Sequence, residues 1–124
     1  MSISLQQRLI RWSGKKVNMS VIELDKVDGM GKSKESNELL FLITDHLDWE
    51  NEHEHLVILQ NKINSYLEFI ESKQYVDVYP QDVLDGYVIE IHFQNGMSEN
   101  CFKFIEVVAN QVEELRVKIR VEAE

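Results

Sequence analysis

The chain has 124 residues, of which 44% are hydrophobic and 28% are charged, a composition that excludes a disordered protein and predicts a compact cytoplasmic one. No apolar run is long enough to cross a membrane, and a single cysteine, Cys101, excludes an internal disulfide. The formal charge of −9 argues against nucleic-acid binding, which depends on cationic contacts with phosphate, and favours a basic protein partner.

Residues 1–18 are predicted to form a piece separate from the following domain. All four of their charged residues are cations, whereas the remaining nine cations stand against 22 acidic residues, a charge of −13. Leu5, Leu9 and Trp12 have the spacing of a short amphipathic helix, which could touch an anionic membrane. Two simpler interpretations remain open: an arm or short helix that packs on the domain, and a natural start at Met19, where the ordered pattern begins.

Residues 20–27 and 38–45 are predicted to be the two strands of a hairpin. The first, SVIELDKV, is rich in β-branched residues, and the second, ELLFLITD, is a nearly continuous apolar run that is typical of a central strand. The loop between them contains GMGKS, which resembles the end of a phosphate-binding loop. Lys26 stands where the first glycine of that motif is required, and a strand follows instead of a helix, so an exposed turn is the better interpretation.

The sequence from Asn51 to Ser72 has the period of a helix. One apolar seam, with three- and four-residue steps, is predicted to face the sheet and consists of Leu56, Leu59, Ile63, Tyr66, Leu67 and Ile70. Asp48 or Asn51 is a suitable N-cap, and the acidic residues that follow suit the positive end of the helix dipole. On the far side of this helix, Ile58 and Phe69 are predicted to form an oligomer contact, which favours a homodimer.

Three further strands and a second helix are predicted after residue 73. Residues 74–80 and 87–93 are the first two strands, and the second of them alternates apolar and polar side chains. Ser98 is a suitable cap for a helix whose apolar residues keep core spacing as far as Leu115. Residues 115–122 form a last alternating strand that points its cations away from the core. The sheet is therefore predicted to keep one open, polar face.

From residue 38 onward, the predicted order of strand, helix, strand, strand, helix, strand is the βαββαβ order of ferredoxin-like proteins. We therefore predict a single α+β domain at residues 19–124. It would be a two-layer sandwich with a mainly antiparallel sheet, an extra N-terminal hairpin strand and both helices on one face of the sheet. Because this scaffold supports many unrelated functions, the fold alone predicts no activity.

The junction between strand 38–45 and the first helix concentrates polar side chains. The candidate binding residues of this junction are Asp45, His46, Asp48, Trp49, His53 and His55. Carboxylates beside an aromatic wall could form an acid/base pocket, although Trp49 is more simply explained as a residue that closes the core. His53 and His55 are two residues apart, so on a helix they point to nearly opposite sides and do not converge on one metal ion. We predict no metal site.

Three segments, ITDHLDW, HLVILQNKINSY and FIE, resemble a family of small bacterial proteins known only as a domain of unknown function. The resemblance covers roughly residues 20–80 and brings no known chemistry. The positions to which it draws attention are Asp45, Asp48, Trp49, His55, Gln60, Lys62, Asn64 and Tyr66. Gln60 and Asn64 also belong to a polar stripe that we expect to hydrogen-bond to neighbouring strands and loops. In the family, a glycine usually follows F-I-E-S, and this chain has Lys73 at that position.

Catalytic signatures are absent from the sequence. It has no G-x-S-x-G elbow and no histidine in an evident triad, and its only cysteine lies on an apolar helix face. We therefore predict a small cytoplasmic bacterial protein without a cofactor that acts as a protein-interaction, immunity or regulatory module. The alternative is a metal-dependent or small-ligand-binding protein, or an enzyme, centred on residues 45–55.

Overall fold

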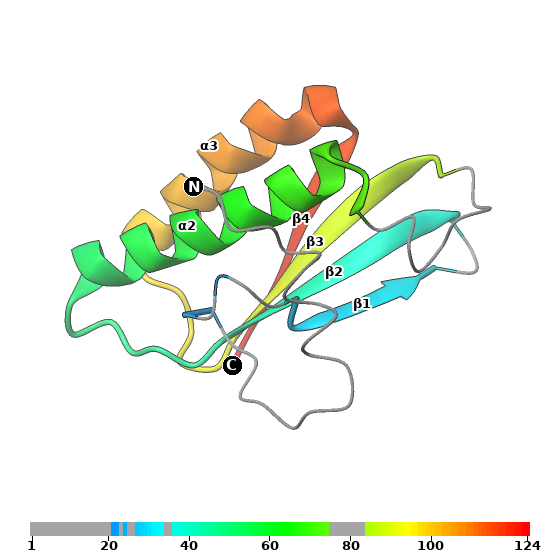
Figure 1. The fold of residues 1–124 in the computed structure, drawn as a ribbon. Coiled ribbons are helices and arrows are strands. Elements are labelled where there is room, and N and C mark those ends of the chain that lie inside the picture. Colours follow the sequence, from blue (N-terminus) through cyan, green and yellow to red (C-terminus); the bar gives the residue numbers. More distant parts are fainter. Residues whose placement is uncertain (1–20, 23, 25–26, 34–35, 75–83) are drawn as a thin grey trace.

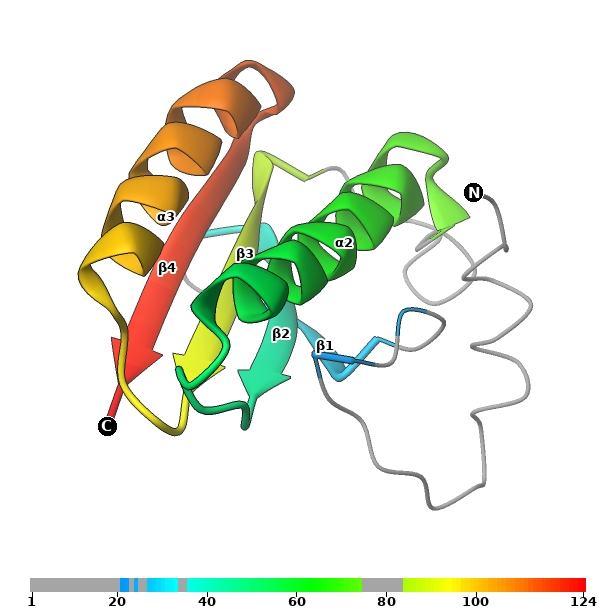
Figure 2. The ribbon, with the colours of Figure 1, turned by 90° about the vertical axis from the view of Figure 1, so that its left-hand side faces the viewer.

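The computed structural model describes residues 21–22, 24, 27–33, 36–74 and 84–124. Its elements are β1 (Gly29–Lys32), β2 (Glu38–Asp45), α2 (Glu52–Glu71), β3 (Gly86–Phe93), α3 (Glu99–Val112), the 3-10 helix η2 (Glu113–Leu115) and β4 (Val117–Ala123). Both helices cover the same face of one four-stranded sheet (Figures 1 and 2), which confirms the α+β class. No helix in this described part is both long and apolar enough to cross a membrane.

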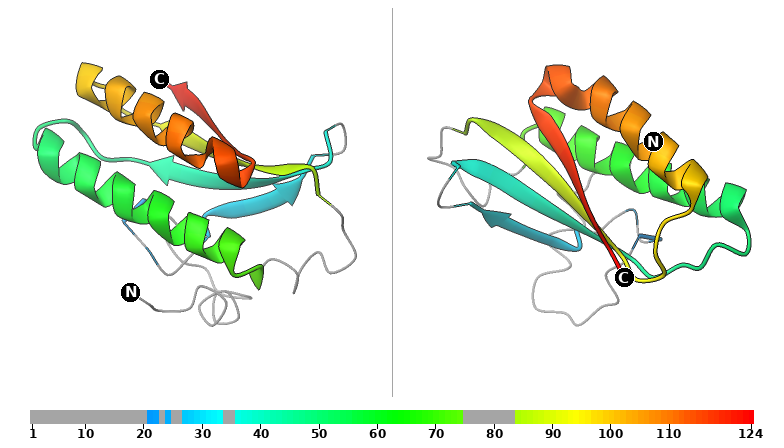
Figure 3. Two further views of the ribbon diagram at one scale, coloured as in Figure 1. Left: turned by 90° about the horizontal axis from the view of Figure 1, so that it is seen from above. Right: turned by 180° about the vertical axis from the view of Figure 1, so that it is seen from behind.

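The strand order in the sheet is β1-β2-β3-β4 (Figure 3). β1 runs antiparallel to β2, whereas β2 and β3 are parallel to each other, and so are β3 and β4. Each helix therefore connects two adjacent parallel strands, and both connections step across the sheet in the same direction. Because such connections are almost always right-handed, two steps in one direction place both helices on the same face.

The predicted ferredoxin-like order and mainly antiparallel sheet are wrong. The last strand, β4, pairs in parallel with β3, and the outer edge of β2 is occupied by β1. The predicted strand 74–80 lies, from residue 75 onward, outside the described residues. Alternating apolar and polar side chains are common to parallel and antiparallel strands, so the sequence pattern identified the strands without identifying their partners.

The first strand begins later than the sequence pattern predicts. β1 lies in the segment that we expected to be a loop. Of the predicted strand 20–27, residues 20, 23, 25 and 26 lie outside the described residues, and the other four are not in a strand. The N–H of Val21 nevertheless donates to the carbonyl oxygen of Thr44 at 2.9 Å. Gly29 pairs with Leu42, and a Cβ added to it would lie 3.3 Å from the Leu42 Cβ. The glycine thus allows close pairing beside a large side chain.

The core fills the space between the sheet and the two helices. Alternate residues of β2 and β3 point toward the helices, and the buried apolar ones are Leu39, Phe41, Ile43, Tyr87, Ile89, Ile91 and Phe93. The buried face of α2 is wider than the predicted seam, because it includes Phe69, whose ring meets the Phe41 ring edge-on at 5.8 Å between centroids. Ile58 is half-buried. The predicted oligomer contact is therefore wrong, since Phe69 belongs to the core.

Both helix starts carry the predicted type of cap. The Asn51 side chain accepts a hydrogen bond from the backbone N–H of Glu54 at 3.4 Å, and the Ser98 hydroxyl accepts one from the N–H of Cys101 at 3.1 Å. These side-chain acceptors satisfy backbone donors that have no partner within the helix.

The end of α2 explains why a glycine suits position 73. The backbone N–H of Ser72 donates to the carbonyl oxygen of Glu68, and that of Lys73 donates to the carbonyl oxygen of Ile70, both at 3.0 Å. Lys73 itself has a φ of 59°, in the left-handed region. A side chain is strained in that conformation and glycine is not, so Lys73 occupies a position that a glycine would fill more favourably.

Candidate functional site

The candidate site lies where β2 ends and α2 begins. Asp45 is the last residue of β2, and His55 is the fourth residue of α2. In open sheets, ligands bind at the carboxyl ends of parallel strands, and this junction lies at that edge of β2 and β3. The fold brings together five of the predicted candidates here: Asp45, His46, Asp48, Trp49 and His55.

Asp45 and His55 form a buried pair. His55 Nε2 lies 2.6 Å from Asp45 Oδ2 and 2.8 Å from Oδ1, and the two side chains are 2% and 0% exposed. The other ring nitrogen, Nδ1, lies 2.9 Å from the backbone carbonyl oxygen of Asp48. A carbonyl oxygen can only accept, so Nδ1 carries a proton, and a second proton lies between Nε2 and the carboxylate. The imidazole therefore has no free lone pair for a metal ion.

Trp49 covers this pair. Its ring stacks on the His55 ring with 3.7 Å between centroids and an angle of 19° between planes. The indole N–H donates to the carbonyl oxygen of Gly96 at 2.9 Å, and the ring also packs against Phe93. Trp49 thus closes the core, as we expected, and it shields the imidazole from solvent on one side.

The Asp45 carboxylate also organises the surrounding backbone. Its Oδ1 atom accepts a hydrogen bond from the N–H of Leu47 at 3.0 Å, and the carbonyl oxygen of the same residue accepts one from the N–H of Gln94 at 2.9 Å. One aspartate therefore joins β2, its following turn, α2 and the loop after β3. The arrangement suits a residue that fixes the junction more than one that reacts.

A pocket of about 360 Å³ opens beside the buried pair. It is lined by His46, Leu47, Asp48, Asn51, Glu54, His55 and Ile58. Asp48 accepts a hydrogen bond from the N–H of Glu50, and Glu54 accepts one from the Asn51 amide at 2.9 Å. Among the described residues, neither of these carboxylates forms a salt bridge with a lysine or arginine. The pocket therefore combines aliphatic walls with two carboxylates that have no lysine or arginine partner among the described residues.

The other predicted residues of α2 do not join this pocket. His53, Gln60 and Asn64 are exposed, so the polar stripe faces solvent and not the strands, contrary to our expectation. Lys62 and Tyr66 lie on the opposite side of the helix and are completely buried. The α2 residues to which the family pattern draws attention are thus divided between the solvent and the core.

Lys62 and Asp28 form a second buried pair. Lys62 Nζ lies 3.0 Å from Asp28 Oδ1, and the other carboxylate oxygen accepts a hydrogen bond from the N–H of Thr44 at 2.9 Å. Burial raises the pKa of Asp28, and the neighbouring Lys62 charge opposes that rise. The pair connects the middle of α2 to the residue that precedes β1.

Tyr66 links the same residues through its hydroxyl. The hydroxyl donates to the carbonyl oxygen of Leu42 at 2.6 Å and accepts from the N–H of Asp28 at 2.8 Å. Burial, followed by the Asp28 charge, raises the pKa of Tyr66 well above its ordinary value, so the phenol stays neutral. Lys62 Nζ also lies 5.2 Å from the centre of the Tyr66 ring.

Sequence reasoning missed Asp28. Nothing in the neighbouring sequence identifies Asp28 as a buried residue, because its partner Lys62 is 34 residues away in the chain. Lys62 did carry a signal, since it lies three residues after Leu59 and four before Tyr66 on the buried side of α2. A lysine in an apolar seam indicates a buried acidic partner, which the sequence alone did not locate.

Cys101 is not positioned to act as a nucleophile. Its side chain lies in the first turn of α3 and is completely buried. Burial, together with the charges of Asp45 and Glu52, raises the pKa of Cys101 to about 12. The thiolate, which is the reactive form, is therefore almost unpopulated at neutral pH.

The comparison with protein families gives one match. The model of a family of unknown function, DUF6572, matches residues 19–124, a range that contains every helix and strand described above. The chain is a member of the DUF6572 family. This confirms the predicted membership in a domain of unknown function. No curated protein and no solved structure matches the chain.

Proposed function

We propose that this DUF6572 protein is a non-catalytic binding module that holds a lysine or arginine side chain of a basic protein partner in the pocket between β2 and α2. The observation that supports the proposal is the presence of two carboxylates, Asp48 and Glu54, over an aliphatic wall and without a lysine or arginine partner among the described residues. A long cationic side chain matches both properties, because it has an apolar stem and a charged end.

The wall and the charges suit successive parts of such a side chain. Leu47 and Ile58 can contact its methylene groups, while Asp48 and Glu54 attract the charged end. The formal charge of −9 adds a long-range attraction for a basic partner, which raises the rate of encounter. A partner would therefore be recognised by one inserted residue and by its overall charge.

The neighbouring groups support binding in preference to catalysis. Both ring nitrogens of His55 already face acceptors, so the imidazole is a poor general base, and the Cys101 thiol is protonated at neutral pH. An acidic module that binds a basic partner and catalyses no reaction would serve as an immunity or regulatory factor in the bacterial cytoplasm.

Titration of ¹⁵N-labelled protein with short lysine- or arginine-containing peptides tests the proposal. We expect saturable shifts confined to residues 46–58. The double variant Asp48→Asn, Glu54→Gln should weaken binding about tenfold, equivalent to roughly 1.4 kcal/mol. The matched control Glu113→Gln, Glu114→Gln removes the same charge from exposed positions of η2 and should bind like the wild type. Equal weakening in both variants, or shifts spread over the surface, would show non-specific attraction and would refute the proposal.

Self-association has a different candidate surface from the one that the sequence predicted. On α3, only Cys101 and Val112 are fully buried, while Phe102 and Val107 are 58% and 54% exposed. Large exposed apolar side chains favour a contact with another protein surface, and a second copy of the chain is one such partner. Light scattering tests this homodimer proposal: the double variant Phe102→Ser, Val107→Ser should be monomeric at concentrations where the wild type is a dimer. A wild-type protein that is already monomeric would refute it.

A further inference from the structure

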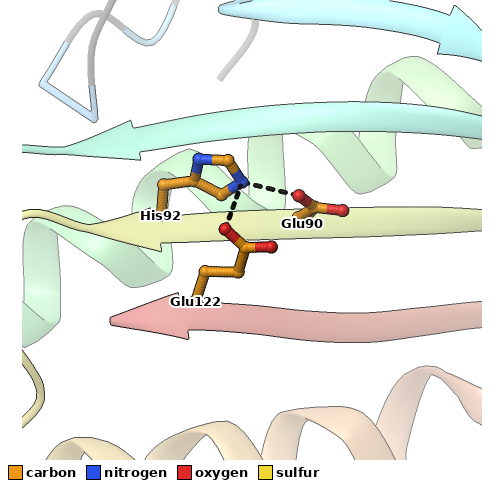
Figure 4. A group of neighbouring side chains, drawn as sticks. All are labelled: Glu90, His92 and Glu122. Atoms are coloured by element: carbon orange, nitrogen blue, oxygen red, sulfur yellow. Dashed lines mark hydrogen bonds and ion pairs between the residues drawn. The ribbon is translucent and has the colours of Figure 1, made fainter. Parts of the chain in front are cut away.

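Three potential metal ligands converge on the face of the sheet that the helices leave open. Glu90 and His92 lie on β3, and Glu122 lies on β4 (Figure 4). His92 and Glu122 are direct partners in the parallel register, and Glu90 precedes His92 by two residues, so all three side chains point to the same face. The backbone of two paired strands therefore fixes their convergence.

The distances suit a small cation. His92 Nε2 lies 2.6 Å from Glu90 Oε2 and 3.7 Å from Glu122 Oε1, and one ligand atom from each residue lies within 4.8 Å of the others. Zinc binds histidine nitrogen and carboxylate oxygen at about 2.0 to 2.2 Å, which places tetrahedral ligands roughly 3.3 Å apart. Small side-chain rotations reach that geometry, and Glu122, which is 68% exposed, is free to make them.

Arg120 holds one of these ligands in place. Its Nε and Nη2 atoms lie 3.0 and 2.8 Å from Glu90 Oε1, so the other carboxylate oxygen, Oε2, is directed toward His92. The hydrogen bond from His92, followed by the bond and charge of Arg120, lowers the pKa of Glu90. The carboxylate is therefore ionised, and Arg120 holds its orientation, as hydrogen-bond partners of metal ligands usually do.

We propose that Glu90, His92 and Glu122 form a site for a divalent transition-metal ion, for which Zn²⁺ is the best match. One imidazole and two carboxylates suit zinc, whereas calcium and magnesium prefer oxygen ligands alone and in larger numbers. Three protein ligands leave coordination positions for water or for a group from another molecule. The site is independent of the pocket between β2 and α2, because it lies on the opposite face of the sheet.

Binding of the ion must displace a proton. At 2.6 Å, His92 Nε2 and Glu90 Oε2 are joined by a hydrogen bond, and only a nitrogen without its proton can bind metal. The facing charged groups are Arg120 and Glu122, from the neighbouring strand.

The experiment is a competition titration of the full chain with Zn²⁺ and a chromophoric chelator near neutral pH. We expect one site in the wild type and a loss of affinity of at least tenfold in His92→Ala and in Glu122→Gln. The matched control is His53→Ala, which removes another exposed histidine from α2 and should bind like the wild type. Wild-type affinity in His92→Ala, or an equal loss in His53→Ala, would show adventitious binding to surface histidines and would overturn the proposal.

Two further measurements, the Tm and the histidine ring resonances, keep the test valid if one variant folds poorly. Zn²⁺ should raise the Tm of the wild type, because an ion that binds only the folded state stabilises it. The increase should be lost in Glu122→Gln, whose altered side chain is mostly in solvent. Zn²⁺ should also shift the His92 ring resonances before those of His53. A Tm increase of the same size in Glu122→Gln, or earlier shifts at His53, would contradict the assigned ligands.

Discussion

Lys62 Nζ lies 3.0 Å from Asp28 Oδ1, and both side chains are completely shielded from solvent. The pair joins the middle of α2 to the residue before β1, at the edge of the sheet. Two charges buried together lose hydration that their attraction only partly replaces, so the pair adds little net stability. Removal of one partner is much more costly, because it leaves the other charge buried alone.

The first prediction concerns this pair. Lys62→Met should lower the free energy of unfolding by about 3 to 5 kcal/mol, because the Asp28 carboxylate loses its cation. Urea denaturation followed by circular dichroism measures the change. The control is Lys118→Met, which removes the exposed partner of Glu38 and should cost less than about 1 kcal/mol. Similar losses in the two variants would show that burial of Lys62 does not govern its contribution.

The second prediction concerns the buried pair of Asp45 and His55, which Trp49 covers. His55→Leu should destabilise the protein by about 3 to 5 kcal/mol, since Asp45 would remain buried without its partner. His53→Leu, two residues earlier and exposed, should change the free energy of unfolding by less than about 0.5 kcal/mol. Thermal or urea unfolding of both variants provides the comparison. If His55→Leu were as stable as the wild type, the buried pair would not organise the junction.

The third prediction concerns the end of α2. Lys73→Gly should stabilise the protein by about 1 kcal/mol, because residue 73 has a φ of 59°, where a side chain is strained. The adjacent Ser72 has a φ of −82°, so Ser72→Gly should instead destabilise by about 0.5 to 1 kcal/mol. Opposite signs for neighbouring glycine substitutions in urea unfolding would confirm the assignment, and equal signs would contradict it.

The fourth prediction concerns the pH dependence contributed by Glu90. The hydrogen bond from His92, followed by Arg120, lowers the pKa of Glu90 from its ordinary value of 4.5. Because the folded pKa is below the unfolded one, the ionised carboxylate stabilises the fold above the ordinary value, and this stabilisation is lost as the pH falls through the lower folded pKa. The wild type should therefore be more stable than Glu90→Gln at about pH 7, and the difference should disappear in acid, below the folded pKa of Glu90.

Urea unfolding of the two proteins at both pH values measures that difference. Glu106→Gln, on the exposed side of α3, is the control and should match the wild type at each pH. A stability difference between wild type and Glu90→Gln that persists in acid would mean that the substitution acts through packing and not through the charge of the carboxylate.

Local patterns were sufficient for the helices and for three of the four described strands. The apolar period predicted α2, and the residues Asn51 and Ser98 predicted its cap and that of α3, because these signals act within one or two turns. β1 was not predicted, because its short glycine-containing sequence has the composition of a turn and becomes a strand only through pairing with β2.

The candidate site was predictable to a similar extent. The polar residues between β2 and α2 were visible as a cluster, and the spacing of His53 and His55 correctly indicated that they do not converge, since one is exposed and the other buried. The sequence did not show that Phe69 enters the core, because the width of the buried face of a helix depends on how far the sheet extends beneath it.

The sequence by itself determined the α+β class and the two caps, because each depends on residues close together in the chain. Only the tertiary structure decided the parallel pairing of β3 with β4, the burial of Lys62 against Asp28 and the meeting of Glu90, His92 and Glu122. These depend on which strand lies beside which, a choice made by the packing of the whole chain. Side-chain alternation is the same for every such choice.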